Sequence, residues 1–257
     1  MSQYVLKAEH LKKSFGGVKA VNDFSFHVEK GQTIAIIGPN GAGKTTIFNL
    51  ISKIYQPDEG TLFLGVEDLM NKSQIEAARM GISRTFQNTR LFTGLNVLDN
   101  VKVALDFAGK CSLFEAMLLM PGRWKHEKET TERAMACLKL LNLDQYAKLR
   151  PSNLPYGIQR RVEIARALVA DPKILMLDEP AAGLNPEEVF QLVDFIKEIK
   201  QKYPDLAVLV IEHRMDLVMN LSDYIYVQDF GQTIAEGVPE QIQNNPLVLK
   251  AYLGEEG

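Results

Sequence analysis

The chain has 257 residues, of which 46% are apolar and 24% charged, so it is long enough to bury a sizeable core. A formal net charge of −3 excludes the overall positive field that attracts nucleic acid, and we expect no nucleic-acid partner. Cys111 and Cys137 have neither the C-x-x-C spacing of a zinc site nor the density of a disulfide framework. No apolar run approaches the ~18 residues that span a bilayer, so we expect a membrane role only through a partner.

The first 64 residues contain four strand-like runs that are separated by turn signals such as Lys30-Gly31. These runs are residues 4–9, 24–29, 33–37 and 61–64. We expect residues 33–37 to form one main strand and the other three runs to form an antiparallel layer beside it.

Farther along, the continuous apolar runs 174–177 and 208–211 predict strands that are buried on both faces of a parallel sheet. Between them, Asn185 and Pro186 suit the N-cap and the first position of a helix that extends to about residue 202. This strand–helix–strand alternation indicates an α/β core. Residues 96–170, in contrast, predict mainly helices.

A glycine-rich motif of the form G-x-x-x-x-G-K-[ST] follows the predicted strand 33–37 and precedes an apolar helical run. Glycines let backbone N–H groups turn towards phosphates, and a helix N-terminus adds positive potential. Lys44 is the residue type that reaches β- and γ-phosphates, and the hydroxyl of Thr45 can ligate magnesium. The predicted nucleotide-binding residues of this loop are Gly38, Pro39, Asn40, Gly41, Ala42, Gly43, Lys44, Thr45 and Thr46.

Two carboxylates end the predicted strand 174–177. Asp178 is expected in the magnesium shell, and Glu179 is expected to polarise the attacking water. An acid pair at a strand end can also cap a helix, but beside a phosphate-binding loop the catalytic interpretation is favoured.

Residues 154–161 resemble the signature segment of the ABC transporter ATPases, and the phosphate loop and the acid pair have the same order in that family. The segment departs from the common Leu-Ser-Gly-Gly-Gln at Pro155, Tyr156 and Ile158. The resemblance implies that Pro155, Tyr156 and Gly157 face the γ-phosphate of ATP bound to an opposing ATPase subunit in a head-to-tail dimer.

Further segments fall in the order of the same family. Gln87 matches the Q-loop, which implies contact with magnesium and with the permease, and His213 matches the switch histidine that bonds the γ-phosphate. Residues 182–185 match the D-loop of the dimer interface, although they also cap a helix. Phe15 occupies the place of the ring that stacks on adenine, and core packing is an equal alternative. By resemblance, the catalytic residues are Glu179, His213 and Gln87, and the magnesium ligands are Thr45, Gln87 and Asp178.

The resemblance extends over the whole chain and is most specific for the LivG-type subunits of branched-chain amino-acid importers. It implies a single ABC ATPase domain with a P-loop (RecA-like) core at 1–90 and 171–257, an antiparallel β layer and a helical subdomain at 91–170. The cofactors implied are ATP and Mg²⁺. The partners implied are a second, LivF-type ATPase, two permease subunits and, indirectly, a substrate-binding protein, at the cytoplasmic face of the inner membrane.

An apolar, methionine-rich insertion at 107–124 stands out within the helical subdomain. It could contact the permease or the partner ATPase, but its spacing is that of ordinary amphipathic packing, which we favour.

Three other functions compete with this interpretation. A GTPase needs an Asn-Lys-x-Asp run, and the nearest match, residues 71–74, lacks the Asp. An ABC protein that acts on DNA or ribosomes usually carries coiled-coil insertions or two fused ATPase units, and this chain has neither. Another cargo, such as urea, other amino acids or lipopolysaccharide, stays open because the cargo does not contact this subunit.

Overall fold

The computed structural model describes residues 4–87, 90–108 and 122–253. The chain divides into two compact units, one formed by Met1–Gln87 with Lys173–Gly257 and one by Asn88–Pro172. The centre of the predicted insertion, residues 109–121, lies outside the described residues. Within the described part, no helix combines the length and the apolarity that crossing a membrane requires.

A four-stranded antiparallel sheet forms the N-terminal layer of the first unit, with the strand order β2-β1-β4-β5. Its strands are β1 (Tyr4–Phe15), β2 (Val18–Glu29), β4 (Glu59–Leu64) and β5 (Glu67–Asp68). The predicted antiparallel layer is therefore confirmed, but β1 and β2 are longer than expected. Gly16 and Gly17 both have positive φ, at 52° and 88°, so they make a tight turn that pairs Phe15 with Val18.

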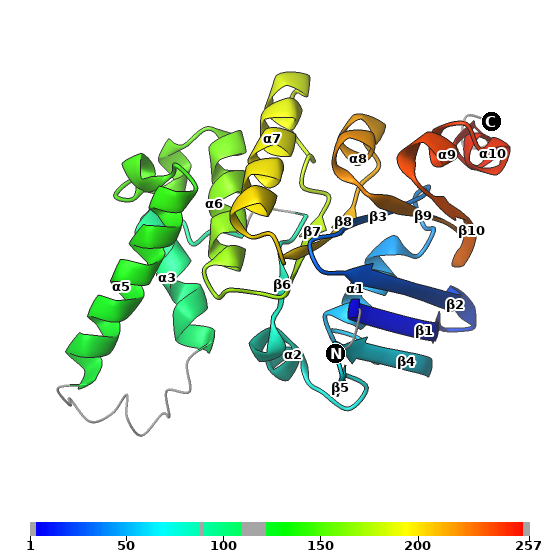
Figure 1. Cartoon of the computed structure of the whole chain (residues 1–257), viewed down its shortest axis with the longest axis horizontal. Coiled ribbons are helices and arrows are strands. Elements are labelled where there is room, and N and C mark those ends of the chain that lie inside the picture. The colour runs from blue at the N-terminus through cyan, green and yellow to red at the C-terminus, as the bar shows by residue number, and fades with distance from the viewer. Residues whose placement is uncertain (1–3, 88–89, 109–121, 254–257) are drawn as a thin grey trace. The chain divides into compact units, whose positions relative to one another are not determined.

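A six-stranded sheet forms the second layer, with the order β10-β9-β3-β8-β7-β6 (Figure 1). All neighbouring pairs are parallel except β9 with β10. The predicted buried strands are confirmed, since every residue of β3, β7 and β8 is buried. The strands are β3 (Thr33–Ile37), β6 (Ile82–Arg84), β7 (Ile174–Asp178), β8 (Ala207–Ile211), β9 (Tyr224–Asp229) and β10 (Gln232–Gly237).

Helices of the first unit lie on both sides of this sheet (Figure 1). Helix α1 buries Ile47, Phe48, Leu50 and Ile51 in one core with residues of both sheets, while α7 and α8 lie on the opposite face. Asn185 caps α7 and forms a capping box with Glu188, as the sequence predicted for the cap. The helices are α1 (Lys44–Ile51), α2 (Gln74–Met80), α7 (Pro186–Lys202), α8 (Met215–Leu221), α9 (Pro239–Gln243) and α10 (Pro246–Leu253).

Over its described residues the second unit contains helices and no strand, as predicted. Its helices are α3 (Val97–Ala108), α5 (Gly122–Leu140) and α6 (Tyr156–Leu168), with short 3₁₀ turns at Asp144–Tyr146 and Pro151–Asn153. Helix α3 contacts both α5 and α6. Burial raises the pKa of the Glu163 carboxyl on α6, against the lowering effect of Arg160, whose Nη1 lies 3.1 Å from Glu163 Oε2.

Candidate functional site

Four segments that the sequence singled out follow neighbouring strands of the six-stranded sheet. The glycine loop follows β3, His213 follows β8, Asp178 and Glu179 end β7, and Gln87 follows β6. In the sheet these strands are adjacent in the order β3-β8-β7-β6, and they run parallel. Because the carboxyl ends of parallel strands meet at one edge, the sheet brings these segments to the edge where α/β proteins bind ligands.

The glycine loop is shaped by close backbone approaches that admit no side chain. A Cβ on Gly38 would lie 2.0 Å from the carbonyl oxygen of Gln228, and a Cβ on Gly43 would lie 2.1 Å from that of Ala20. Gly43 also has a φ of 96°, which L side chains rarely adopt. At Gly41 the space is open, with no atom within 4 Å of the added Cβ. The loop is therefore packed against backbone at Gly38 and Gly43, whereas the space at Gly41 is open.

Lys44 begins α1, and its side chain folds over the glycine loop. Its Nζ donates hydrogen bonds of 2.7 Å to the carbonyl oxygens of Gly38 and Pro39, and the residue is 7% exposed. The N-cap of α1 is Gly43, so no side chain caps the first N–H groups of the helix. A buried ammonium group beside an uncapped helix start fits a phosphate group.

Asp178 lies buried at the end of β7 and contacts Arg84. Arg84 Nη2 donates to Asp178 Oδ2 at 2.7 Å, whereas Asp178 Oδ1 accepts no hydrogen bond from any described residue. Thr45 is exposed in the first turn of α1. No group of three or more His, Cys, Asp or Glu residues that could hold a metal occurs among the described residues. A single carboxylate and a hydroxyl nevertheless fit Mg²⁺, which keeps waters and substrate phosphates as its other ligands.

Glu179 contacts Gln87 directly. Gln87 Nε2 donates to Glu179 Oε2 at 2.7 Å, so the ends of β6 and β7 place these two predicted catalytic residues together. The backbone of Glu179 is left-handed, with a φ of 44°, and its N–H donates to the carbonyl of Ile211 at 3.0 Å. Such a conformation in a residue other than glycine is typical of functional sites.

His213 is exposed at the end of β8, next to a fully buried carboxylate that the sequence analysis did not identify. Glu212 Oε2 accepts hydrogen bonds from the backbone N–H of His213 at 2.9 Å and of Arg214 at 3.1 Å. Its Oε1 accepts from the N–H of Ala181 at 2.8 Å. Glu212 thus joins the switch segment to the loop after Glu179. A charged residue directly after the apolar run 208–211 was the available signal.

Phe15 ends β1 with 42% of its surface exposed, so core packing does not account for the ring. It meets Tyr55 edge-on at a centroid distance of 5.2 Å, and Lys13 Nζ lies 5.5 Å from its centroid. An exposed ring supported from one side could stack on a nucleotide base. Its contact with adenine stays a prediction.

The signature residues Pro155, Tyr156 and Gly157 belong to the second unit, at the start of α6. Pro155 is the N-cap, with no side-chain hydrogen bond to the helix, and Tyr156 is the first helical residue. Proline is common at the first helical position, whereas Pro155 lies one position before it. The ring of Tyr156 lies 5.4 Å from the guanidinium of Arg160. The contact of the signature residues Pro155, Tyr156 and Gly157 with a nucleotide stays a prediction.

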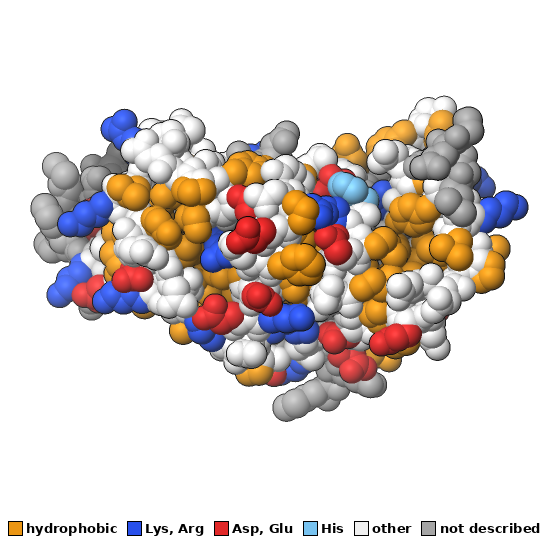
Figure 2. All heavy atoms as spheres, turned by 90° about the horizontal axis from the view of Figure 1, so that it is seen from above, with side chains coloured by type: hydrophobic (Ala, Val, Ile, Leu, Met, Phe, Trp, Pro, Cys, Tyr) orange, Lys and Arg blue, Asp and Glu red, His pale blue; other side chains and the backbone are white. Residues whose placement is uncertain are grey.

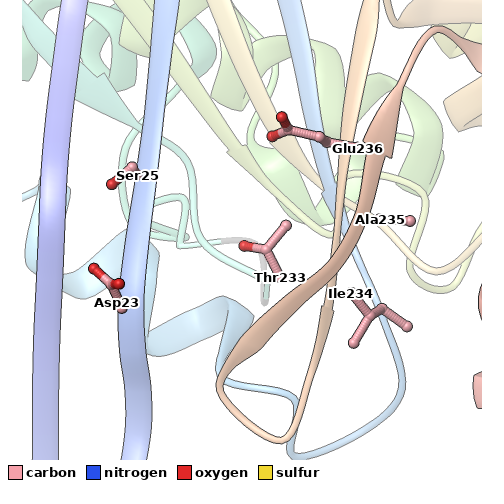
Figure 3. Close-up of a pocket in the computed structure, with 6 residues that line it drawn as sticks. All are labelled: Asp23, Ser25, Thr233, Ile234, Ala235 and Glu236. Carbon is pink, nitrogen blue, oxygen red and sulfur yellow. The ribbon is translucent and has the colours of Figure 1, made fainter.

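A pocket of about 410 Å³ lies where β2 and β10 approach each other (Figure 3). Asp23 and Ser25 of β2 and residues 233–236 of β10 line it, and none of these is a predicted site residue. Asp23 contacts His10, since His10 Nδ1 lies 2.7 Å from Asp23 Oδ1.

On the face shown in Figure 2, Lys and Arg side chains are interspersed with Asp and Glu side chains, so charge of one sign does not cover that face.

The mainly parallel sheet, the glycine loop at the start of α1 and the acid-terminated strand β7 define the class of P-loop nucleotide hydrolases. The family model described as ABC transporter matches residues 21–182, and a model described as branched-chain amino acid ATP-binding cassette transporter matches residues 232–257. The chain belongs to the ABC transporter family of ATP-hydrolysing subunits.

Two curated relatives have similar lengths. The chain is 45% identical to the high-affinity branched-chain amino acid transport ATP-binding protein LivG of Escherichia coli K12, over 99% of this chain and 100% of that protein. It is 43% identical to BraF of Pseudomonas aeruginosa, with the same coverage. The ADP conformation of an ATP-binding cassette of an ABC transporter superposes with a TM-score of 0.84 and 33% identity, over 98% of this chain and 99% of that one.

Proposed function

We propose that this chain is the subunit that binds and hydrolyses ATP to power an ABC importer of branched-chain amino acids. One observation carries the enzymatic part of the proposal: four adjacent parallel strands bring the glycine loop, Asp178, Glu179, Gln87 and His213 to one edge. The 2.7 Å contact between Gln87 and Glu179 supports it, because it joins two of these segments at the proposed site of hydrolysis.

The roles of the residues follow from the chemistry of phosphoryl transfer, which depends on positioning and on charge stabilisation. Lys44 and the N–H groups of the loop bind the β- and γ-phosphates, Phe15 stacks on the base, and His213 bonds the γ-phosphate. Glu179, oriented by Gln87, accepts a hydrogen bond from the attacking water and directs it at the γ-phosphorus. Thr45, Gln87 and Asp178 would hold Mg²⁺, which when bound neutralises charge on the phosphates.

The partners in this proposal are a second, LivF-type ATPase, two permeases and, indirectly, a substrate-binding protein. The dimeric structure of a bacterial ABC transporter cassette supports pairing, with a TM-score of 0.74 at 26% identity over 91% of this chain and 98% of that one. We place the chain at the cytoplasmic face of the inner membrane, held by the permeases. Both compact units would form one ABC ATPase domain, with the signature residues of the second unit facing the ATP of the opposing subunit.

The cargo assignment rests on the relatives and on the C-terminal match. LivG and BraF are both named for branched-chain amino acid transport, and the model that matches residues 232–257 carries the same description. This C-terminal segment favours branched-chain amino acids over urea, other amino acids or lipopolysaccharide.

A reconstituted transporter tests the proposal. We expect proteoliposomes that contain this chain, the permeases and ATPase encoded beside its gene, and the binding protein to accumulate radiolabelled leucine when MgATP is supplied. Leucine uptake without ATP hydrolysis, or ATP-driven uptake of urea but not of leucine, would contradict it. Liposomes that carry Lys44→Ala in place of the native chain are the matched control, because that change removes the side chain whose ammonium group is proposed to bind the phosphates.

The proline at the signature N-cap leads to a separate prediction. Pro155 offers neither a hydroxyl nor an N–H, so we propose that this half-site is functional but weak and that the two ATP sites of the dimer are unequal. A serine hydroxyl would accept a cap hydrogen bond from α6, worth about 1 kcal/mol of helix stability. The serine would also supply a hydroxyl and a backbone N–H as donors for the opposing phosphate. We expect Pro155→Ser to raise ATP turnover of the assembled complex about threefold to tenfold. Turnover equal to that of the native complex would show that the asymmetry does not arise here.

A further inference from the structure

Arg84, the last residue of β6, has a buried guanidinium that contacts two elements of the proposed nucleotide site. Its side chain is 8% exposed. Nη2 donates to Asp178 Oδ2 on β7 at 2.7 Å. Nη1 donates to Asn49 Oδ1 on α1 at 2.7 Å and to Oγ of Ser52, the C-cap residue of α1, at 2.9 Å. The guanidinium therefore connects the strand that ends in Asp178 with the helix that begins at Lys44.

Two aromatic rings hold the guanidinium in place. Its central carbon lies 5.5 Å from the ring centroid of Phe48 on α1 and 5.4 Å from that of Phe86, two residues after Arg84. Both distances are within the ~6 Å range of cation–π contacts. The Nε atom is buried without a hydrogen-bond partner, so the side chain gives up one hydrogen bond in this position. The environment therefore favours a planar cation with two separate donor groups at its end.

The contacts on α1 lie on the helix face that carries Thr45. Asn49 follows Thr45 by four residues, which places both on one side of α1, and the C-cap Ser52 follows Thr45 by seven, at the end of the same side. We infer that Arg84 is a positioning residue that sets the separation between Thr45 and Asp178, two of the three proposed oxygen ligands of the Mg²⁺ site. This inference rests on the proposed nucleotide site.

The geometry at Asp178 is compatible with such a role. Arg84 donates only to Oδ2 of Asp178, and Oδ1 accepts no hydrogen bond from the described residues. One carboxylate oxygen is therefore left for the metal shell. Loss of the guanidinium would have two opposite effects on cation binding. The loss of positive charge would strengthen binding, and the loss of the fixed carboxylate would weaken it. Lysine at this position keeps the charge and loses the forked geometry, so Arg84→Lys isolates the positional effect.

The test compares nucleotide binding with and without Mg²⁺ for the full-length protein. Titration with a fluorescent ATP analogue in EDTA gives metal-free affinity, and titration with Mg²⁺ at fixed nucleotide gives the metal dependence. We expect Arg84→Lys to raise the Mg²⁺ concentration for half-saturation about tenfold and to change metal-free affinity less than twofold. The matched control is Arg79→Lys, the same change at an exposed residue of α2 in the same unit, which is expected to change neither quantity.

A second variant covers the case in which Arg84→Lys does not fold, which thermal unfolding would reveal. Asn49→Ala removes one contact on the helix side and leaves the contact with Asp178, and we expect a rise of about threefold in the Mg²⁺ requirement. Unchanged Mg²⁺ dependence in the folded variants would overturn the inference. Equal loss of metal-free and metal-dependent binding would also overturn it, because that is the result of general destabilisation. Failure of the native protein to bind the nucleotide with Mg²⁺ would instead overturn the proposed function.

Discussion

Replacing Glu179 by Gln is expected to preserve MgATP binding and to reduce hydrolysis by at least about a hundredfold, the lower end of what a positioned general base contributes. The amide has the size of the carboxylate, and its oxygen can still accept the hydrogen bond that Gln87 Nε2 donates at 2.7 Å. It carries no negative charge, however, so it cannot polarise the attacking water in the same way. The site would bind its substrate and stall before the chemical step.

Phosphate release by the complex with the partner ATPase, measured beside nucleotide affinity, checks this expectation. The stalled complex should also elute as an ATP-bound dimer in size-exclusion chromatography. Glu187→Gln is the matched control, because Glu187 is an exposed carboxylate in the first turn of α7. Phosphate release near the native rate by the Glu179 variant would remove this residue from the mechanism.

A second large effect is expected from Gly43→Ala. The added methyl carbon would lie 2.1 Å from the carbonyl oxygen of Ala20, which is backbone in β2 and cannot turn aside. The φ of 96° adds about 1–3 kcal/mol of strain for any residue that has a Cβ. The loop must therefore shift away from β2, and with it the start of α1. We expect ATP affinity to fall more than tenfold and the melting temperature to fall as well.

The control for Gly43→Ala is a glycine that also has a positive φ but has free space around it. Gly65 has a φ of 62°, and no atom lies within 4 Å of an added Cβ. Gly65→Ala should therefore lower the melting temperature through strain alone and leave ATP affinity unchanged. Isothermal titration and thermal unfolding of both variants separate the two effects. Equal nucleotide affinities for the two variants would show that the close approach to Ala20 does not shape the loop.

The features that the sequence predicted are those that short segments encode. The glycine loop, Lys44 and Thr45 lie within eight consecutive residues, so their arrangement follows from local turn and helix geometry. The N-cap of α7 at Asn185 is equally local. The buried strands β3, β7 and β8 were recognisable because they are short, continuous apolar runs.

The features that were missed in the sequence depend on strand pairing or on contacts between distant segments. Strand β9 has a clear apolar run, but β10 is recognisable as a strand only through its pairing with β9 after the turn at Phe230-Gly231. Arg84 and Asp178 are 94 residues apart, and Glu212 and Ala181 are 31 residues apart. No periodicity relates such positions, because the order of the strands in the sheet brings them together.

Because the backbone of Glu179 is left-handed, thermal stability and ATP turnover favour different residues at this position. At a φ of 44° a glycine would relieve the strain, so selection for heat resistance alone would favour replacing the carboxylate. In the proposed mechanism the native carboxylate retains ATP hydrolysis at a cost in stability, whereas glycine would gain stability and lose hydrolysis. Engineering of a more thermostable variant should therefore keep Glu179 and place stabilising substitutions elsewhere in the chain.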